Sequence, residues 1–89
     1  MLYHFLSSKT ITLYFSDDCG HCQKFKPEWE KIKNSGLVNA REVNCKQNPD
    51  QCNNIEGYPT IRITNGFTVS DYENGARTLD DIVRFYNNV

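Results

Sequence analysis

The sequence ITLYFSDDCGHC occupies residues 11–22 and decides the fold that we expect for this chain. Its β-branched and aromatic residues predict a strand over residues 10–16, and a helix is expected to begin near Gly20. Cys19 and Cys22 then lie three positions apart on the first helical turn. Free N–H groups and the helix dipole stabilise a negatively charged sulfur at such an N-terminus. The pattern is typical of a thiol pair that closes into a disulfide and reopens.

The spacing of apolar residues predicts that the helix continues well beyond the thiol pair. Phe25, Trp29 and Ile32 recur at intervals of four and three residues, which places them on one face of a helix over residues 20–34. A second strand is expected over residues 37–44. Together these segments predict a strand–helix–strand unit in which the two strands run parallel.

A short helix is expected after the second strand. Asn48 suits the N-cap, Pro49 suits the first helical position and Gln51 suits the third. Gly57 is expected to end this helix after a few residues.

A β-hairpin and a final helix complete the chain. Alternation predicts strands over residues 60–64 and 67–72, joined by a two-residue turn at Asn65-Gly66, where both positions favour positive φ. Thr78 is expected to cap the last helix. Four apolar residues line its buried face: Leu79, Ile82, Val83 and Tyr86. The order βαβαββα predicts an α/β fold with a parallel pair, an antiparallel hairpin and helices on both faces of the sheet.

Length and charge restrict the possible classes of function. The 89 residues are expected to form one domain, residues 1–89, and the net charge of −1 reflects 10 basic and 11 acidic side chains. This balance offers no electrostatic footprint for nucleic acid or an anionic membrane, and no apolar stretch approaches the roughly 20 residues of a membrane span. We therefore expect a monomer that binds neither nucleic acid nor membranes.

The N-terminal segment bears on location. Residues 1–9 lack a basic leader and their apolar part ends by Leu6, so we expect no signal peptide and a cytoplasmic protein. A domain cut from a secreted precursor would instead belong to an oxidising compartment. Four cysteines in a reducing compartment favour redox or metal chemistry over a disulfide scaffold. Residues 1–9 themselves are expected to form a short edge strand or a docked arm.

Four motifs in order point to a known family. They are Cys19-Gly-His-Cys22 with Pro27 five residues later, Gly57-Tyr-Pro-Thr60 before a strand, the Asn65-Gly66 hairpin, and Tyr72-Glu-Asn-Gly-Ala-Arg77 before the last helix. Over roughly residues 11–88 the chain resembles a protein disulfide isomerase catalytic domain of the thioredoxin superfamily. The resemblance implies a thioredoxin-like three-layer fold, with a central mixed sheet flanked by helices. It also implies a thiol–disulfide oxidoreductase that acts on proteins, with no cofactor besides the redox-active disulfide and no metal.

The resemblance implies a role for each residue of the first motif. Cys19 is the nucleophile that forms a mixed disulfide with a client protein, and Cys22 is the more buried thiol that releases the client. Gly20 and His21 form the Gly-His pair found in disulfide isomerases. His21 would stabilise the dithiol form and make the pair more oxidising. The alternative for His21 is a solvated helix residue.

The second and fourth motifs are implied to bind the client and to assist its release. Pro59 would follow a cis peptide bond in a loop that faces the disulfide. The backbone of Tyr58, next to Gly57, would pair with an extended client peptide, as in strand addition. Arg77 would swing toward the second cysteine and stabilise its thiolate. The alternatives are a trans proline at an edge strand and an ordinary surface arginine.

Two departures from the family pattern concern proton transfer and charge. Leu13 occupies the position of a buried acid that shuttles protons to the second cysteine, so proton transfer is expected to be slower or water-mediated. Asp18 replaces a Trp, and together with Asp17 it disfavours a thiolate at Cys19. We expect the helix and His21 to outweigh the two aspartates, because these can turn into water.

Cys45 and Cys52 form a second pair, separated by six residues. Some disulfide isomerase domains show the same spacing, so the resemblance makes a structural disulfide possible. In a reducing cytosol the two would be small buried hydrophobic residues. A four-cysteine zinc site is a further alternative.

Two other functions are compatible with the same motifs. One is a thioredoxin- or glutaredoxin-like reductant of a specific enzyme, and the other is a non-catalytic binding module that docks partners along the edge at Tyr58 and Pro59. The redox potential separates the reductant from the isomerase. Activity in cysteine variants separates both from the binding module.

Overall fold

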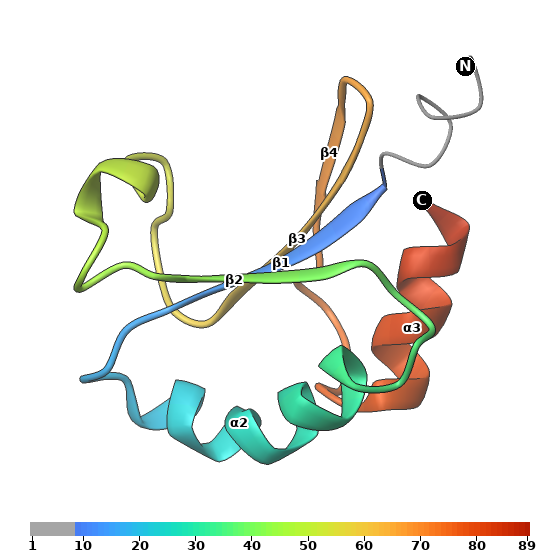
Figure 1. The fold of residues 1–89 in the computed structure, drawn as a ribbon, viewed down its shortest axis with the longest axis horizontal. Coiled ribbons are helices and arrows are strands. Elements are labelled where there is room, and N and C mark those ends of the chain that lie inside the picture. The colour runs from blue at the N-terminus through green and yellow to red at the C-terminus, as the bar shows by residue number, and fades with distance from the viewer. Residues whose placement is uncertain (1–8) are drawn as a thin grey trace.

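The computed structural model describes residues 9–89 of the chain (Figure 1). The elements follow the predicted order: β1 (Thr10–Phe15), α2 (Gly20–Lys33), β2 (Ala40–Asn44), the 3-10 turn η1 (Pro49–Gln51), β3 (Thr60–Asn65), β4 (Thr68–Asp71) and α3 (Leu79–Asn88). The expectation of an edge strand or arm concerns residues 1–9, of which residues 1–8 lie outside the described part. Within residues 9–89, no helix has the length and apolar character needed to cross a bilayer.

β1 lies inside a four-stranded mixed sheet with the order β2-β1-β3-β4. It runs parallel to β2 and antiparallel to β3, and β3 turns back into β4. This is the predicted parallel pair extended by an antiparallel hairpin, so the thioredoxin-like α/β fold is confirmed. Tyr14 pairs with Thr60, so the C-terminal end of β1 and the N-terminal end of β3 lie side by side at the same end of the sheet.

Both α-helices cover the same face of the sheet. Ile11 pairs with Ile63 and Leu13 with Ile61, and these four side chains belong to one core cluster. The helices contribute Phe25, Trp29, Ile32, Ile82 and Tyr86 to it.

A smaller cluster beside η1 holds Tyr14, Val43, Cys45, Cys52 and Ile55. Figure 1 shows α2 and η1 on opposite sides of β2. The predicted helical layer on that second face is reduced to η1 and its flanking loops, because the apolar residues of β1 and β3 alternate toward one face.

The hairpin turn lies one residue later than predicted. Asn65 pairs with Thr68, which leaves Gly66 and Phe67 as the two central residues. Gly66 has a φ of +63°, and among the described residues none other than glycine has a positive φ. A glycine at the first central position is typical of a type II′ turn, whose twist matches that of the flanking strands. Strand pairing therefore overrides the Asn-Gly signal.

β2 and η1 are shorter than the sequence predicts. β2 begins at Ala40, because the residues between α2 and β2 form a turn around Gly36, whose φ is +75°. η1 is a single turn that ends at Gln51, well before Gly57. Asn48 does not cap it, since its side-chain amide donates to the carbonyl at the end of β2.

α3 begins where the sequence predicts. Thr78 Oγ1 accepts the backbone N–H of Asp81 at 3.3 Å, so the predicted N-cap is confirmed. Ile82 and Tyr86 are buried, whereas Leu79 is partly exposed. The helix thereby closes one end of the main core.

Glu28 on α2 connects the two helices. Its Oε2 accepts the backbone N–H of Leu79, the first residue of α3, at 2.7 Å, and its Oε1 pairs with Lys31 at 3.3 Å. These contacts, the bond from Leu79 first, hold the pKa of Glu28 below its ordinary value of 4.5. A carboxylate of α2 thus satisfies a free N–H at the N-terminus of α3.

Glu28 is expected to make the stability of the domain depend on acid pH. Because its pKa is lower in the folded than in the unfolded chain, its contribution is complete above about pH 5 and is lost as the pH falls through the folded value. In Glu28→Gln the amide oxygen still accepts the Leu79 N–H but does not titrate. Between about pH 5 and pH 3 the free energy of unfolding should therefore fall less in this variant. Urea unfolding across this range measures the difference, and equal pH dependence would contradict the assignment.

A disulfide joins Cys45 and Cys52 beside η1, with an S–S distance of 2.11 Å and Cα atoms 5.8 Å apart. Both residues are buried in the smaller cluster. The bond leaves no set of four free thiols for the zinc alternative. Within residues 9–89, no group of three or more His, Cys, Asp or Glu side chains is arranged to hold a metal ion.

Removal of this disulfide is expected to destabilise the domain by about 2–3 kcal/mol, because a crosslink over a separation of seven residues restricts the unfolded chain. The variant Cys45→Ala, Cys52→Ala removes it without leaving free thiols. Denaturant unfolding gives the loss, with Cys19→Ala, Cys22→Ala as the control that keeps the crosslink. A loss below about 0.5 kcal/mol would show that the crosslink does not stabilise the fold.

Candidate active site

The thiol pair lies at the junction of β1 and α2. Cys19 is the N-cap of α2 and has extended backbone, with φ −94° and ψ 113°. Its sulfur accepts the backbone N–H of Cys22 at 3.0 Å, and its own N–H donates to the carbonyl of Ser16 at 3.1 Å. The sulfur takes the place that a Ser, Thr or Asp oxygen takes at most N-caps. Negative charge is favoured at this position by the N–H groups and the helix dipole.

The two thiols are free and differ in their surroundings. Cys19 is partly exposed, whereas Cys22 is only 6% exposed. Burial, followed by the hydrogen bond with Cys19, raises the pKa of Cys22 to about 11. A backbone hydrogen bond from Ser16 and the charge of Arg77 act in the opposite direction. The outer sulfur is therefore accessible from the solvent, and the inner one is protonated at neutral pH.

The loop before β3 lies at the same end of the sheet as the thiols. The peptide bond between Tyr58 and Pro59 is cis. Thr60 Oγ1 donates to the carbonyl of Gly57 at 2.6 Å, which closes the loop onto the start of β3. Tyr58 is 38% exposed, and the loop borders a groove of about 400 Å³ that Arg77 also lines. An exposed residue and a groove therefore lie beside the start of a central strand.

The other predicted site residues lie on the exposed side of α2. His21 and Arg77 line a shallow hollow together with Glu28. Arg77 also borders the groove beside Pro59, so it bridges the loop and the helix. Gly20 opens α2, and no neighbouring atom lies within 4 Å of the place that a Cβ would take there. The roles implied for these residues stay predictions.

The two aspartates before the thiols have partners. Asp18 pairs with Lys46 at 3.1 Å, and Asp17 accepts an N–H from the side-chain amide of Asn44 at 3.0 Å. Both residues are exposed, as expected, and the Asp18 side chain is 75% exposed, so the two carboxylates face water while they keep these partners. The partners come from the parallel pairing of β1 and β2, which brings the segments that follow the two strands together.

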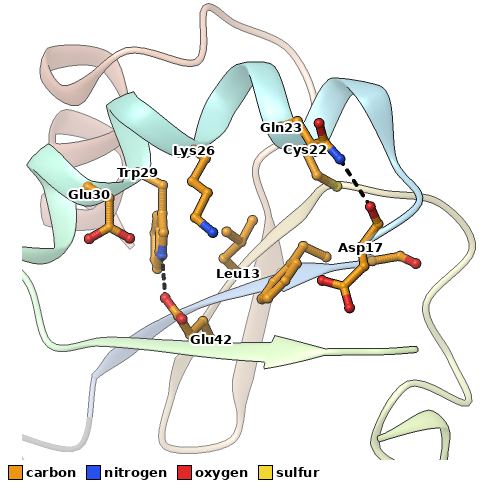
Figure 2. Close-up of a pocket in the computed structure, with 10 residues that line it drawn as sticks. Leu13, Asp17, Cys22, Gln23, Lys26, Trp29, Glu30 and Glu42 are labelled. Atoms are coloured by element: carbon orange, nitrogen blue, oxygen red, sulfur yellow. Dashed lines mark hydrogen bonds between the residues drawn. The ribbon is translucent and has the colours of Figure 1, made fainter. Parts of the chain in front are cut away.

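A cavity of about 360 Å³ lies beside Cys22, between α2 and the sheet (Figure 2). Leu13 lines it and is buried, and the register places Glu42 of β2 next to Leu13. The indole N–H of Trp29 donates to Glu42 Oε1 at 2.9 Å. Sequence reasoning missed Glu42. No local signal could have found it, because its side chain is 41% exposed and its place beside Leu13 follows only from the pairing of β1 with β2.

Comparisons with known sequences agree with this geometry. The thioredoxin family model matches residues 5–88. Over 79 residues the chain is 41% identical to bloodstream-specific protein 2 of Trypanosoma brucei brucei, covering 84% of this chain and 16% of that protein. Over 74 residues it is 36% identical to protein disulfide-isomerase A3 of Gallus gallus, covering 79% of this chain and 15% of that protein. The chain thus spans a small part of the length of these relatives.

Comparisons with solved structures give the same result. The J-Trx1 fragment of ERdj5 superposes with a TM-score of 0.82 at 25% identity, covering 92% of this chain and 41% of the fragment. The first thioredoxin domain of mouse protein disulfide-isomerase A4 has a TM-score of 0.75 at 28% identity, covering 98% of this chain and 68% of that one. The chain belongs to the thioredoxin family, and it is similar to domains of protein disulfide isomerases.

Proposed function

We propose that this domain is a thiol–disulfide oxidoreductase that acts on protein thiols and disulfides through Cys19 and Cys22. The observation that carries the proposal is the partly exposed sulfur of Cys19 at the N-terminus of α2, which accepts the N–H of Cys22 beside a buried second thiol. Similarity to protein disulfide isomerases supports the same chemistry. No cofactor or metal takes part in the proposed reaction.

The proposed reaction transfers two electrons in two steps. In the direction of reduction, the Cys19 thiolate attacks one sulfur of a client disulfide, and the other client sulfur leaves as a thiolate. Cys22 then attacks the Cys19 sulfur, closes the disulfide between the two cysteines and releases the second client thiolate. Oxidation of a client dithiol follows the same steps in reverse.

The client is proposed to bind as an extended segment along Tyr58, next to Gly57. The exposure of Tyr58 and the groove that borders this loop support the assignment. Arg77 is proposed to assist the release step, because its charge lowers the pKa of Cys22 against the effect of burial. The partner is accordingly another protein.

The physiological direction depends on the redox potential of the pair and on the compartment. His21 between the cysteines favours an oxidant or isomerase, because it stabilises the dithiol form. The disulfide between Cys45 and Cys52 also fits an oxidising compartment better than the cytoplasmic location that the sequence predicts. We therefore place oxidation and isomerisation ahead of the reductant function.

Equilibration with glutathione buffers of graded potential tests the proposal. Alkylation followed by mass measurement of the peptide that holds Cys19 and Cys22 gives the fraction oxidised. A midpoint near about −180 mV is expected for an isomerase, whereas one near about −270 mV would indicate a reductant. A pair that never interconverts would leave only the binding-module alternative.

A further inference from the structure

The cavity beside Cys22 has a mixed lining, of which the larger part is apolar. Leu13 and Phe15 supply apolar surface, while Lys26 and Glu42 supply charged groups. Figure 2 shows the Lys26 side chain running into the space between α2 and the sheet. At about 30 Å³ per water molecule, a cavity of about 360 Å³ accommodates several. Water inside it would connect the thiol of Cys22 with the carboxylate of Glu42.

The release step of the proposed reaction creates a need for a base. Cys22 is buried and its pKa is raised to about 11, so at neutral pH it carries a proton that it must lose before or during its attack. The two residues of β1 that line the cavity are Leu13 and Phe15, and neither side chain accepts a proton. A proton acceptor for this step has to come from another element.

Glu42 is placed to serve as that acceptor. Its Oε1 is anchored by two donors, the indole of Trp29 at 2.9 Å and the ammonium of Lys33 at 3.2 Å. Within the described part of the chain, its Oε2 accepts no hydrogen bond. The register places Glu42 directly beside Leu13, on the same face of the sheet. The carboxylate is thus oriented by its neighbours and keeps one oxygen available.

We propose that Glu42 accepts the proton of Cys22 through the water of this cavity during release of the client, an inference that rests on the proposed function. The Cys22 S–H bond breaks, and its proton passes through water to Glu42 Oε2. The sulfur electron pair forms the bond to Cys19, and the bond between Cys19 and the client breaks. The client leaves as a thiolate with the electron pair of the bond that breaks. Glu42 then returns its proton to the solvent.

Other charged groups surround the two ends of this route. Asp17 and Glu30 are the remaining carboxylates of the cavity. Asp17 lies in the exposed β1–α2 loop and accepts a hydrogen bond from Asn44, and Glu30 pairs with Lys33 at 3.1 Å from the helical side. Neither lies beside Leu13 in the sheet, so both serve as matched controls.

Positively charged side chains act on both the proton acceptor Glu42 and the proton donor Cys22. Lys33 and Lys26 hold the pKa of Glu42 below its ordinary value, after the larger effect of the hydrogen bond from Trp29. Arg77 acts on Cys22, where the charge of Cys19 opposes it. These groups keep Glu42 ionised, and therefore able to accept a proton, at pH values well below neutral.

Single-turnover reaction of the reduced protein with dithiobis(nitrobenzoate) separates the two steps. Attack by Cys19 releases a first thionitrobenzoate, and attack by Cys22 on the mixed disulfide releases a second. If a carboxylate accepts the proton, the rate of the second phase should be nearly independent of pH between about pH 5.5 and 7. If hydroxide accepts it instead, that rate should fall about tenfold for each unit by which the pH is lowered. The variant Glu42→Gln tests the acceptor with the anchoring bond kept, because the new amide oxygen can still accept the Trp29 N–H.

In Glu42→Gln the first phase should be unchanged, and the second should be slower by about a hundredfold at pH 6 and lose its flat region. Asp17→Asn and Glu30→Gln should keep the native profile, and the thermal midpoint of each variant reports its fold. A native profile in Glu42→Gln, or loss of the flat region in either control instead, would overturn the inference. Absence of the first phase in the native protein would overturn the proposed function, and this inference with it.

Discussion

Cys19→Ser is expected to slow reduction of insulin disulfides by at least about a thousandfold, down to the uncatalysed rate. The proposed first step needs a sulfur that is both open to the client and able to carry negative charge. Cys19 is the partly exposed thiol, whereas Cys22 is 6% exposed and stays protonated at neutral pH. A serine hydroxyl at residue 19 can still accept the N–H at the start of α2, but it forms no disulfide. The fold should survive while the chemistry is lost.

The control for this experiment is the pair Cys45→Ala, Cys52→Ala, which removes the disulfide beside η1, on the opposite side of β2 from α2. We expect it to keep most of the activity, since these residues pack beside η1 and not at the thiol pair. The decisive comparison is the double variant Cys19→Ser, Cys22→Ser. Native activity in that protein would show that Cys19 and Cys22 do not carry the reaction, and it would overturn the proposed function.

Local signals were sufficient to predict most of the fold. The apolar run of β1, the spacing of Phe25, Trp29 and Ile32 on α2, and the cap at Thr78 each depend on residues close together in the chain. The errors arise where distant pairing decides. The hairpin turn shifts to Gly66 because Asn65 pairs with Thr68, and both α-helices lie on one face because the isoleucines of β1 and β3 share it.

The candidate site divides in the same way. The thiol pair and the loop at Pro59 are contained in short motifs, so the sequence could locate them. The partners of Asp17 and Asp18 come from the segment around Asn44, and Glu42 reaches the cavity only through the pairing of β1 with β2. These contacts depend on strand register, which no local pattern in the chain specifies. Motifs therefore located the thiol pair, and the structure supplied its electrostatic surroundings.

Cys22→Ser is expected to convert transient complexes with clients into stable ones. The variant keeps Cys19 at the N-cap, where attack on a client disulfide still forms the mixed disulfide. Release then lacks its nucleophile, because a hydroxyl at residue 22 does not displace the client sulfur. With insulin as the client, mass measurement under non-reducing conditions should show a covalent adduct of the domain with insulin. The native protein should show almost none at the same time point.

The adduct has a defined origin, which makes the result specific. It should disappear on addition of dithiothreitol, and it should be absent when Cys19→Ser is combined with Cys22→Ser, because no attacking sulfur remains at either position. Equal release from Cys22→Ser and from the native protein would mean that another thiol, or water, completes the reaction. In that case the buried position of Cys22 beside the cavity would have no part in the chemistry, and the two-step exchange would have to be replaced by a mechanism that uses Cys19 alone.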